Sequence, residues 1–402
     1  MIDTEGTGTA HEASSPSACT MTIEEIRTLL AADGQYFGRP SLRILADGTW
    51  VMVYIRSKHH WADPQGEIGV MFSADEGRTW SEPNQLPDGT PVVGLPGRPS
   101  PPGSPYDPVE PYVYLAPSGE LVVTAMNVDL SGMREGKPCH DDGCAWITVS
   151  SDNGRTWDAW RKVGFVDLPE GQSADEIDLT QDAFVDGETM YAASRIRDKD
   201  RLVGPHNKAI AGLFASVDNG RTWRFVNYID AEVNWDRTLD CETGIERVGP
   251  TDIVAVMRGT LQGCALPWLA TSNDMGKTWA PLVQAHKRVG SWKRPRIYTC
   301  KHLRHLSGAE SIPEWWHDNL LLGTGVDQVS ADPFRRNVGL WYSLDTGKTW
   351  SAPLDLDQDT EDAGYGDMRM RKNGDLVIAS YHGSFAEAAV KQYVVRMAGC
   401  AV

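Results

Sequence analysis

An octapeptide of the form Ser-x-Asp-x-Gly-x-Thr-Trp occurs five times in this chain of 402 residues. The copies span residues 73–80, 150–157, 216–223, 272–279 and 343–350. A repeat at this irregular spacing indicates one supersecondary unit per copy, with insertions in the loops. Asp and Gly at its centre favour a tight turn, because Asp bonds nearby backbone N–H groups and Gly tolerates positive φ.

A second kind of turn recurs between the copies. Short Asx-Gly or Ser-Gly pairs lie between apolar runs at residues 47–48, 118–119, 186–187 and 373–374, with weaker turns near 249–250 and 316–319. Six hairpins of this kind predict an all-β, six-bladed β-propeller with four-stranded antiparallel blades. We assign residues 36–402 to the propeller, and residues 1–35 to an N-terminal tail with a short helix, since residues 22–25 form a capping-box pattern.

Charge and composition exclude several classes of partner. The chain has 38 Lys+Arg against 55 Asp+Glu, a net charge of -17, which argues against binding of nucleic acid or of an anionic membrane surface. No apolar run approaches the roughly 20 residues of a membrane span. The first 19 residues show no signal peptide, and the seven scattered cysteines indicate a reducing compartment rather than a disulfide framework. We therefore expect a cytoplasmic protein, and the sequence does not indicate its oligomeric state.

The octapeptide resembles the Asp box of the sialidase (neuraminidase) superfamily, and the resemblance extends over residues 36–398. It implies that the boxes are structural and lie at the blade periphery. It also implies a site at the centre of the propeller, where sialidases place three arginines, an acidic Asp and a Tyr–Glu pair.

The catalytic residues that the resemblance implies come from three segments. Residues 363–368 contain Tyr365, the expected nucleophile, followed by Gly366 where the family more often has Ser. The segment 241–248 contains Glu242, favoured over Glu246 as the base because it stands at the start of a predicted strand. Asp63, in the loop 59–64, is the expected acid.

The resemblance also implies three arginines that bind the substrate. Arg39 is followed directly by Pro40, whereas the family motif has one residue between them. Arg258 lies 16 residues after the expected base, and the third arginine is Arg335 or Arg336, before the fifth box. The tandem histidines at 59–60 are not expected from the family. The predicted substrate-binding residues are Arg39, Arg258, Arg335, Arg336, His59 and His60.

Other residues keep alternatives open. The basic segment 293–296 could supply the third arginine, and the segment 106–110, Arg195 and Arg197 could line the pocket. The loop 139–144 offers two thiols, an imidazole and carboxylates, but its spacing fits no standard zinc pattern. We therefore predict no metal and no cofactor.

These groups suit a sialic acid, whose carboxylate would repel a carboxylate nucleophile; sialidases use Tyr instead. Glu242 would activate Tyr365, Asp63 would protonate the leaving oxygen, and the arginines would bind the substrate carboxylate. The resemblance thus implies a hydrolase of carbohydrate metabolism, a retaining exo-glycosidase that releases a terminal sialic acid from an anionic carbohydrate.

Two other functions remain open on the same fold. Asp63 and Glu242 could act as a carboxylate pair on another sugar, or a histidine of 59–60 with Tyr365 could eliminate across a uronate, as in a polysaccharide lyase. The chain could also be a non-catalytic binding propeller.

Overall fold

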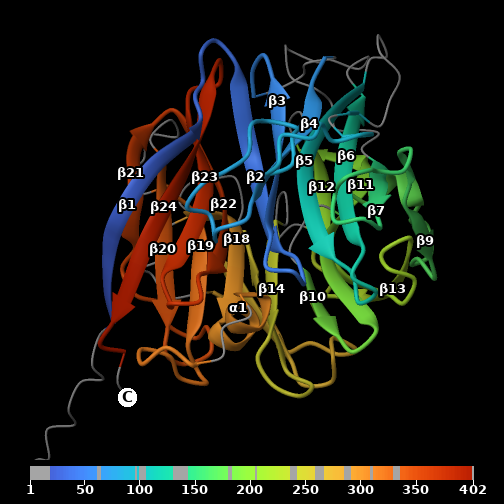
Figure 1. Ribbon diagram of the computed structural model, residues 1–402. Helices are drawn as coiled ribbons and strands as arrows, with labels where there is room; N and C mark the ends of the chain where they lie inside the picture. Colours follow the sequence, from blue (N-terminus) through green and yellow to red (C-terminus); the bar gives the residue numbers. More distant parts are fainter. Residues whose placement is uncertain are drawn as a thin grey trace, which may run out of the picture.

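The computed structural model is an all-β molecule with a β-propeller arrangement (Figure 1). It describes residues 19–60, 65–95, 97–98, 106–129, 144–179, 183–203, 206–235, 242–258, 267–284, 291–307, 311–328 and 336–400. The strands form five hydrogen-bonded sheets, which we number I to V. The described helices are η1 (Ala174–Glu176) and α1 (Cys300–Ser307), and no helix in these segments is long and apolar enough to cross a membrane.

Sheets I to IV follow one another along the chain. Sheet I comprises β5 (Tyr106–Leu115), β6 (Leu121–Asp129), β7 (Cys144–Ser150) and β8 (Arg161–Lys162). Sheet II comprises β10 (Ala183–Asp186), β11 (Thr189–Val203), β12 (His206–Ser216), β13 (Thr222–Tyr228) and β9 (Gly164–Val166). Sheet III comprises β14 (Thr243–Arg247), β15 (Ile253–Met257), β16 (Trp268–Ser272) and β17 (Val283–Gln284). Sheet IV comprises β18 (Ser291–Thr299), β19 (Leu321–Gln328), β20 (Arg336–Ser343) and β21 (Leu354–Thr360).

Sheet V has seven strands and contains both ends of the described chain. Its strands are β22 (Asp362–Met370), β23 (Leu376–Gly383), β24 (Ala388–Ala398), β2 (Tyr36–Ile44), β3 (Trp50–Ser57), β4 (Glu67–Ser73) and β1 (Thr20–Leu30). A parallel contact of β2 with β24, at Tyr36 and Ala388, joins the first and last predicted blades into one sheet. The predicted six separate four-stranded blades are therefore not confirmed.

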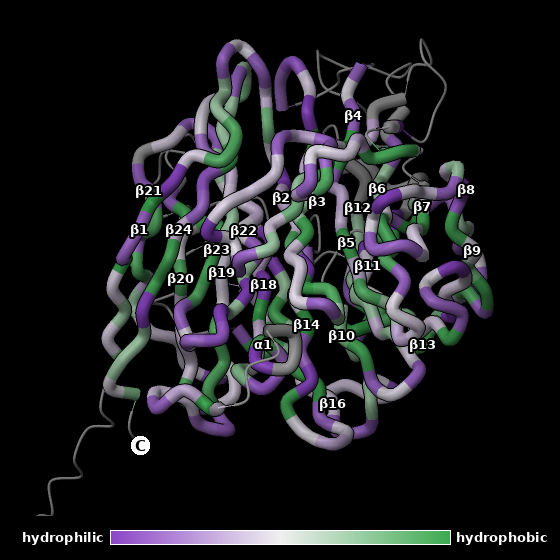
Figure 2. Tube along the Cα trace, in the orientation of Figure 1, coloured by the Kyte–Doolittle hydropathy of each residue, from purple (hydrophilic) through white to green (hydrophobic). Residues whose placement is uncertain are grey.

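Hydrophobic clusters connect the five sheets in a closed ring. One cluster lies at each junction: V with I, I with II, II with III, III with IV, and IV with V. In Figure 2, hydrophobic stretches lie along strands such as β10 and β20, and much of the hydrophilic colour lies at the connecting turns. Burial of these strand faces supplies the main driving force for assembling the sheets.

The five Asp boxes have one common geometry. In each box the Ser hydroxyl donates to the Asp carboxylate, and the Gly N–H donates to the Ser oxygen at 2.8–2.9 Å. The last four boxes link the third strand of a sheet to its fourth, for example β7 to β8. The boxes therefore stabilise turns at the outer part of the sheets.

The predicted N-terminal helix is wrong, because residues 20–30 form strand β1. This strand pairs antiparallel with β24, and the two lie side by side in Figure 1. Met21 and Ile23 pack against the core, whereas Ile26, expected on the helix's apolar face, is 55% exposed. The edge of β24 offers unpaired backbone N–H and C=O groups, and hydrogen bonding to them stabilises a strand here more than the local capping pattern stabilises a helix.

One disulfide joins the two ends of the described chain, and the cysteine count did not predict it. Cys19 and Cys400 form a disulfide across a sequence separation of 381 residues, next to the β1–β24 pair. Disulfides persist mainly in oxidising compartments. The cysteine pattern therefore no longer favours a reducing compartment, and the cytoplasmic location stays a prediction.

Candidate active site

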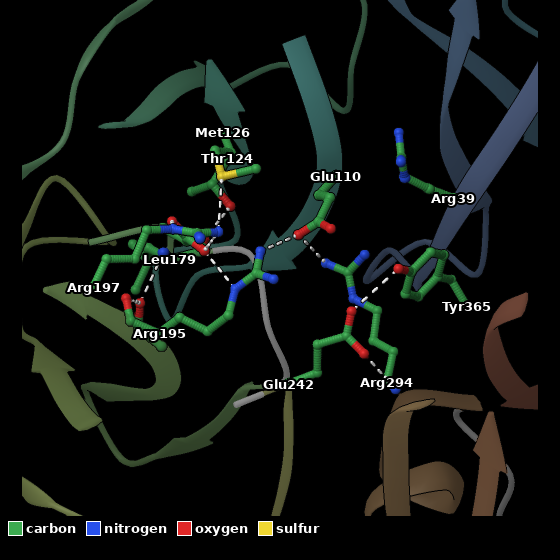
Figure 3. A network of polar contacts seen from close by, with 12 residues as sticks. Arg39, Glu110, Thr124, Met126, Leu179, Arg195, Arg197, Glu242, Arg294 and Tyr365 are labelled. Carbon is green, nitrogen blue, oxygen red and sulfur yellow. Dashed lines mark hydrogen bonds and ion pairs between the residues drawn. The ribbon is translucent and has the colours of Figure 1, made fainter. Parts of the chain in front are cut away.

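A β-bulge recurs in four strands, β2, β5, β18 and β22. The register shifts between residues 38 and 41 of β2, 109 and 112 of β5, 293 and 296 of β18, and 364 and 367 of β22. The first bulged residue in each has positive φ: Arg39 (53°), Glu110 (55°), Arg294 (44°) and Tyr365 (51°). Such conformations cost non-glycine residues about 1–3 kcal/mol and gather at functional sites. Here they bring four chemically active side chains into one cluster (Figure 3).

Tyr365 and Glu242 form a hydrogen-bonded pair. The Tyr365 hydroxyl donates to Glu242 Oε1 at 3.1 Å, and Glu242 is only 2% exposed. The other carboxylate oxygen lies 3.2 Å from Arg258 Nη1 and accepts the Arg294 backbone N–H at 2.8 Å. These contacts fix the carboxylate facing the phenol.

Burial raises the pKa of Tyr365 well above its ordinary value, and the charges of Glu242 and Glu110 raise it further. Arg294 and Arg39 act in the opposite direction. The Arg294 guanidinium carbon lies 4.4 Å from the centre of the Tyr365 ring, and that of Arg39 lies 6.0 Å away. The phenol is therefore protonated at neutral pH and needs a base to become a nucleophile.

Glu110 connects this pair to a second group of arginines. Its Oε2 lies 2.6 Å from Arg195 Nη2 and 3.2 Å from Arg294 Nη2 (Figure 3). Asp178 pairs with Arg195 and binds Arg197 through both carboxylate oxygens, at 3.1 and 3.0 Å. The cluster therefore alternates buried cations and anions along one side of the site.

Arg39 approaches the same space from β2. It is 2% exposed, and its Nη2 contacts both Nε2 and the carbonyl oxygen of His60. Within the part of the chain that the structure describes, its buried Nε and Nη1 have no hydrogen-bond partner. Arg39 thus retains donors for a ligand in this cluster.

Two glycines permit the close approach of the strands. A Cβ at Gly244 would lie 2.5 Å from the Pro295 carbonyl oxygen, so glycine lets β14 pack against the β18 bulge. A Cβ at Gly366 would lie 2.6 Å from Thr324 Oγ1, which explains why glycine follows Tyr365 here.

The structure brings together Tyr365, Glu242, Arg258 and Arg39 among the predicted site residues. Asp63 and Arg335 lie outside the described residues, and Arg336 begins β20 without a described side chain. His59 is exposed, whereas His60 is buried against Arg39. Glu246, the alternative base, contacts His302 and Thr299 instead.

Arg294 and Glu110 are the members of the cluster that the sequence did not rank. A shared signal marks their bulges, because a charged residue stands directly before proline in Arg39-Pro40, Glu110-Pro111 and Arg294-Pro295. No group of three or more potential metal ligands occurs in the described segments, and residues 139–143 of the proposed metal loop lie outside them.

The ring of sheets and the five boxes define an Asp-box β-propeller with a buried Tyr–Glu–Arg cluster. The BNR repeat-like domain family matches residues 108–378, more than half of the sequence. The chain therefore belongs to this family. A comparison with curated proteins finds no match.

Solved structures share this fold. The chain is similar to a protein of unknown function from Dyadobacter fermentans DSM 18053, with a TM-score of 0.66, 14% identity, and coverage of 94% of this chain and 99% of that one. It is also similar to the Hadza microbial sialidase Hz136, with a TM-score of 0.65, 20% identity, and coverage of 92% and 68%. For Trypanosoma rangeli sialidase in complex with sialic acid, the TM-score is 0.60, the identity 14%, and the coverage 92% and 58%. The chain thus spans less than two thirds of the length of the Trypanosoma rangeli enzyme. At these identities, the similarities establish the fold alone.

Proposed function

We propose that this protein is a retaining exo-glycoside hydrolase that releases a terminal sialic acid, with Tyr365 as its nucleophile. The observation that carries the proposal is the 3.1 Å hydrogen bond from the Tyr365 hydroxyl to Glu242, surrounded by buried arginines. The fold shared with sialidases supports it.

In the first step, Glu242 takes the phenol proton while Tyr365 attacks the anomeric carbon. A phenol has no charge to repel the substrate carboxylate, in contrast to an Asp or Glu nucleophile. Asp63 gives a proton to the leaving oxygen and later activates the water that releases the sugar. Two displacements retain the configuration at the anomeric carbon.

Arg39, Arg258 and Arg294 bind the substrate carboxylate in this proposal. Arg294 takes the role first expected of Arg335 or Arg336, because its guanidinium lies over the Tyr365 ring. Charge-assisted bonds from arginine to a carboxylate are strong and directional. The cations also raise the local concentration of an anionic ligand, despite the overall charge of -17.

Hydrolysis of a fluorogenic 4-methylumbelliferyl sialoside tests the proposal. We expect turnover by the native protein, and a loss of kcat of about 10²–10⁴-fold in Glu242→Gln, since the base is removed. Tyr365→Phe should lose at least as much. Tyr228→Phe, a half-buried tyrosine of β13 outside the cluster, is the control and should keep native kinetics.

Native turnover by Tyr365→Phe would show that the nucleophile is wrong. An ultraviolet-absorbing unsaturated product from a uronate polymer, without sialoside hydrolysis, would favour the lyase instead.

A further inference from the structure

His60 is the described partner that holds the Arg39 side chain through hydrogen bonds. Its Nε2 lies 3.2 Å from Arg39 Nη2, and its carbonyl oxygen accepts from the same nitrogen at 3.4 Å. His60 is 4% exposed, so this contact is shielded from water. The contact occupies one guanidinium nitrogen, and among the described residues the other two have no hydrogen-bond partner.

The partners of His60 define its tautomer. Arginine can only donate hydrogen bonds, so Nε2 must accept and the ring proton must be on Nδ1. Nδ1 contacts the fully buried Asp362, which also accepts the Tyr36 hydroxyl at 2.8 Å. The geometry therefore describes a neutral imidazole between a carboxylate and a guanidinium.

Five described groups from four segments face this imidazole. They are Tyr36 and Arg39 of β2, Asp362 of β22, Tyr381 of β23, and Phe385, whose carbonyl accepts the His60 backbone N–H at 2.8 Å. Asp362 carries the negative charge among them, and Arg39 the positive charge. A second proton on His60 would therefore be attracted by Asp362 but would stand directly against Arg39.

We propose that His60 is a positioning residue for Arg39 and makes carboxylate binding sensitive to pH. This inference rests on the proposed function, in which Arg39 binds the substrate carboxylate. Neutral His60 adds no charge beside Arg39, whose guanidinium keeps two donors available to the ligand. Protonated Nε2 can no longer accept a hydrogen bond, and two adjacent cations repel each other. On acidification, Arg39 therefore loses its bond to the imidazole, and the KM for an anionic sugar rises.

Steady-state kinetics between pH 5 and 8, with the fluorogenic sialoside, test the inference. His60→Gln is the informative variant, because Gln can accept from Arg39 and donate to Asp362 but does not titrate. We expect the native KM to rise about tenfold or more on acidification and the His60→Gln KM to stay nearly constant, with similar pH profiles of kcat. His60→Ala should raise KM about tenfold at every pH, and His317→Gln, in the turn before β19, should behave as the native protein.

A second measurement does not depend on turnover. Nitrogen-15 NMR of labelled histidines, with the His60 signals assigned through their loss in His60→Gln, should show an Nδ1–H tautomer at pH 7. An Nε2–H tautomer, a doubly protonated ring at pH 7, or an unchanged pH dependence of KM in His60→Gln would overturn the inference. Absence of any sialoside turnover, together with the Nδ1–H tautomer, would instead refute the proposed function and leave the positioning of Arg39 supported.

Discussion

Charge pairing differs among the arginines that surround Tyr365. Arg294 shares Glu110 with Arg195, and Arg258 pairs with Glu242, whereas Arg39 contacts the imidazole of His60. Buried ion pairs add little net stability, yet removal of one partner is costly because it leaves a buried charge alone. Glu110 therefore helps to neutralise two neighbouring cations, Arg294 and Arg195, the second of which also pairs with Asp178.

Substitution of Glu110 by Ala tests this role. We expect the free energy of unfolding to fall by about 3–5 kcal/mol, because Arg195 and Arg294 lose their shared buried carboxylate. Urea denaturation measures the loss. The control is Glu120→Ala, which removes a more exposed pair with Arg221 and should cost about 1 kcal/mol or less. Equal losses in the two variants would contradict the structural role of Glu110.

At this scale the sequence predicted Tyr365, Glu242, Arg258 and Arg39 through the resemblance of their segments, in order along the chain, to sialidase motifs. It did not select Arg294. The third arginine was sought next to the fifth box, at Arg335 or Arg336. That prediction stays untested, because Arg335 and the side chain of Arg336 lie outside the described part of the chain. The direction of the side chains in the cluster depends on the bulges. A bulge is a register shift between two paired strands, so the sequence of one strand alone does not predict it.

Among the elements, the turns were predictable and the sheet edges were not. Box sequences contain their own hydrogen-bond partners, so their turns form locally. Residues 20–30 instead adopt the conformation that the edge of β24 imposes. Specific polar contacts also join the edges of neighbouring sheets, and Asp357 of β21 makes several of them.

Asp357 connects sheet IV to sheet V. Its Oδ2 accepts from Lys391 Nζ at 2.7 Å and from the Tyr393 hydroxyl at 2.8 Å, and His382 Nδ1 lies 3.0 Å away. Burial alone would raise the pKa of Asp357, but these partners hold it well below its usual value. Because the pKa of Asp357 is lower in the folded state than in the unfolded state, its ionised form stabilises the fold at any pH above the unfolded-state pKa of ~3.9. This contribution is lost as the pH falls from that value toward the folded-state pKa.

Asp357→Asn should therefore lower the free energy of unfolding by about 1–2 kcal/mol at pH 7. The expected loss is modest because the side chain of Asp357 is partly exposed to water, which weakens its ion pairs. The difference from the native protein should shrink as the pH falls below about 4. Urea denaturation at pH 7, 4 and 3 measures it. A difference that stays constant down to pH 3 would show that the charge of Asp357 is not responsible.

For the whole molecule, closure of the ring brings together the two ends of the described chain. β1 pairs with β24, β2 contacts β24 at one residue pair, and Cys19 is bonded to Cys400. The repeat predicted the all-β propeller arrangement, since each copy marks one hairpin. The sequence could not show that the first and last predicted blades form one sheet, because this pairing joins residues more than 350 positions apart.

Cys400→Ser tests the contribution of the disulfide to this closure. We expect a loss of about 2–5 kcal/mol in the free energy of unfolding, since a cross-link over a long loop constrains the unfolded chain. Thermal unfolding with and without dithiothreitol measures the effect. Reductant should lower the Tm of the native protein and leave that of Cys400→Ser unchanged. A native Tm that does not respond to reductant would contradict the stabilising role.

Covalent trapping tests the role of Tyr365 most directly. The protein is incubated with 2,3-difluorosialic acid, digested and analysed by peptide mass spectrometry. We expect one sialosyl adduct, on the peptide that contains Tyr365, and none in Tyr365→Phe. Sialoside turnover without an adduct on Tyr365, or an adduct on a carboxylate such as Glu242, would contradict a tyrosine nucleophile.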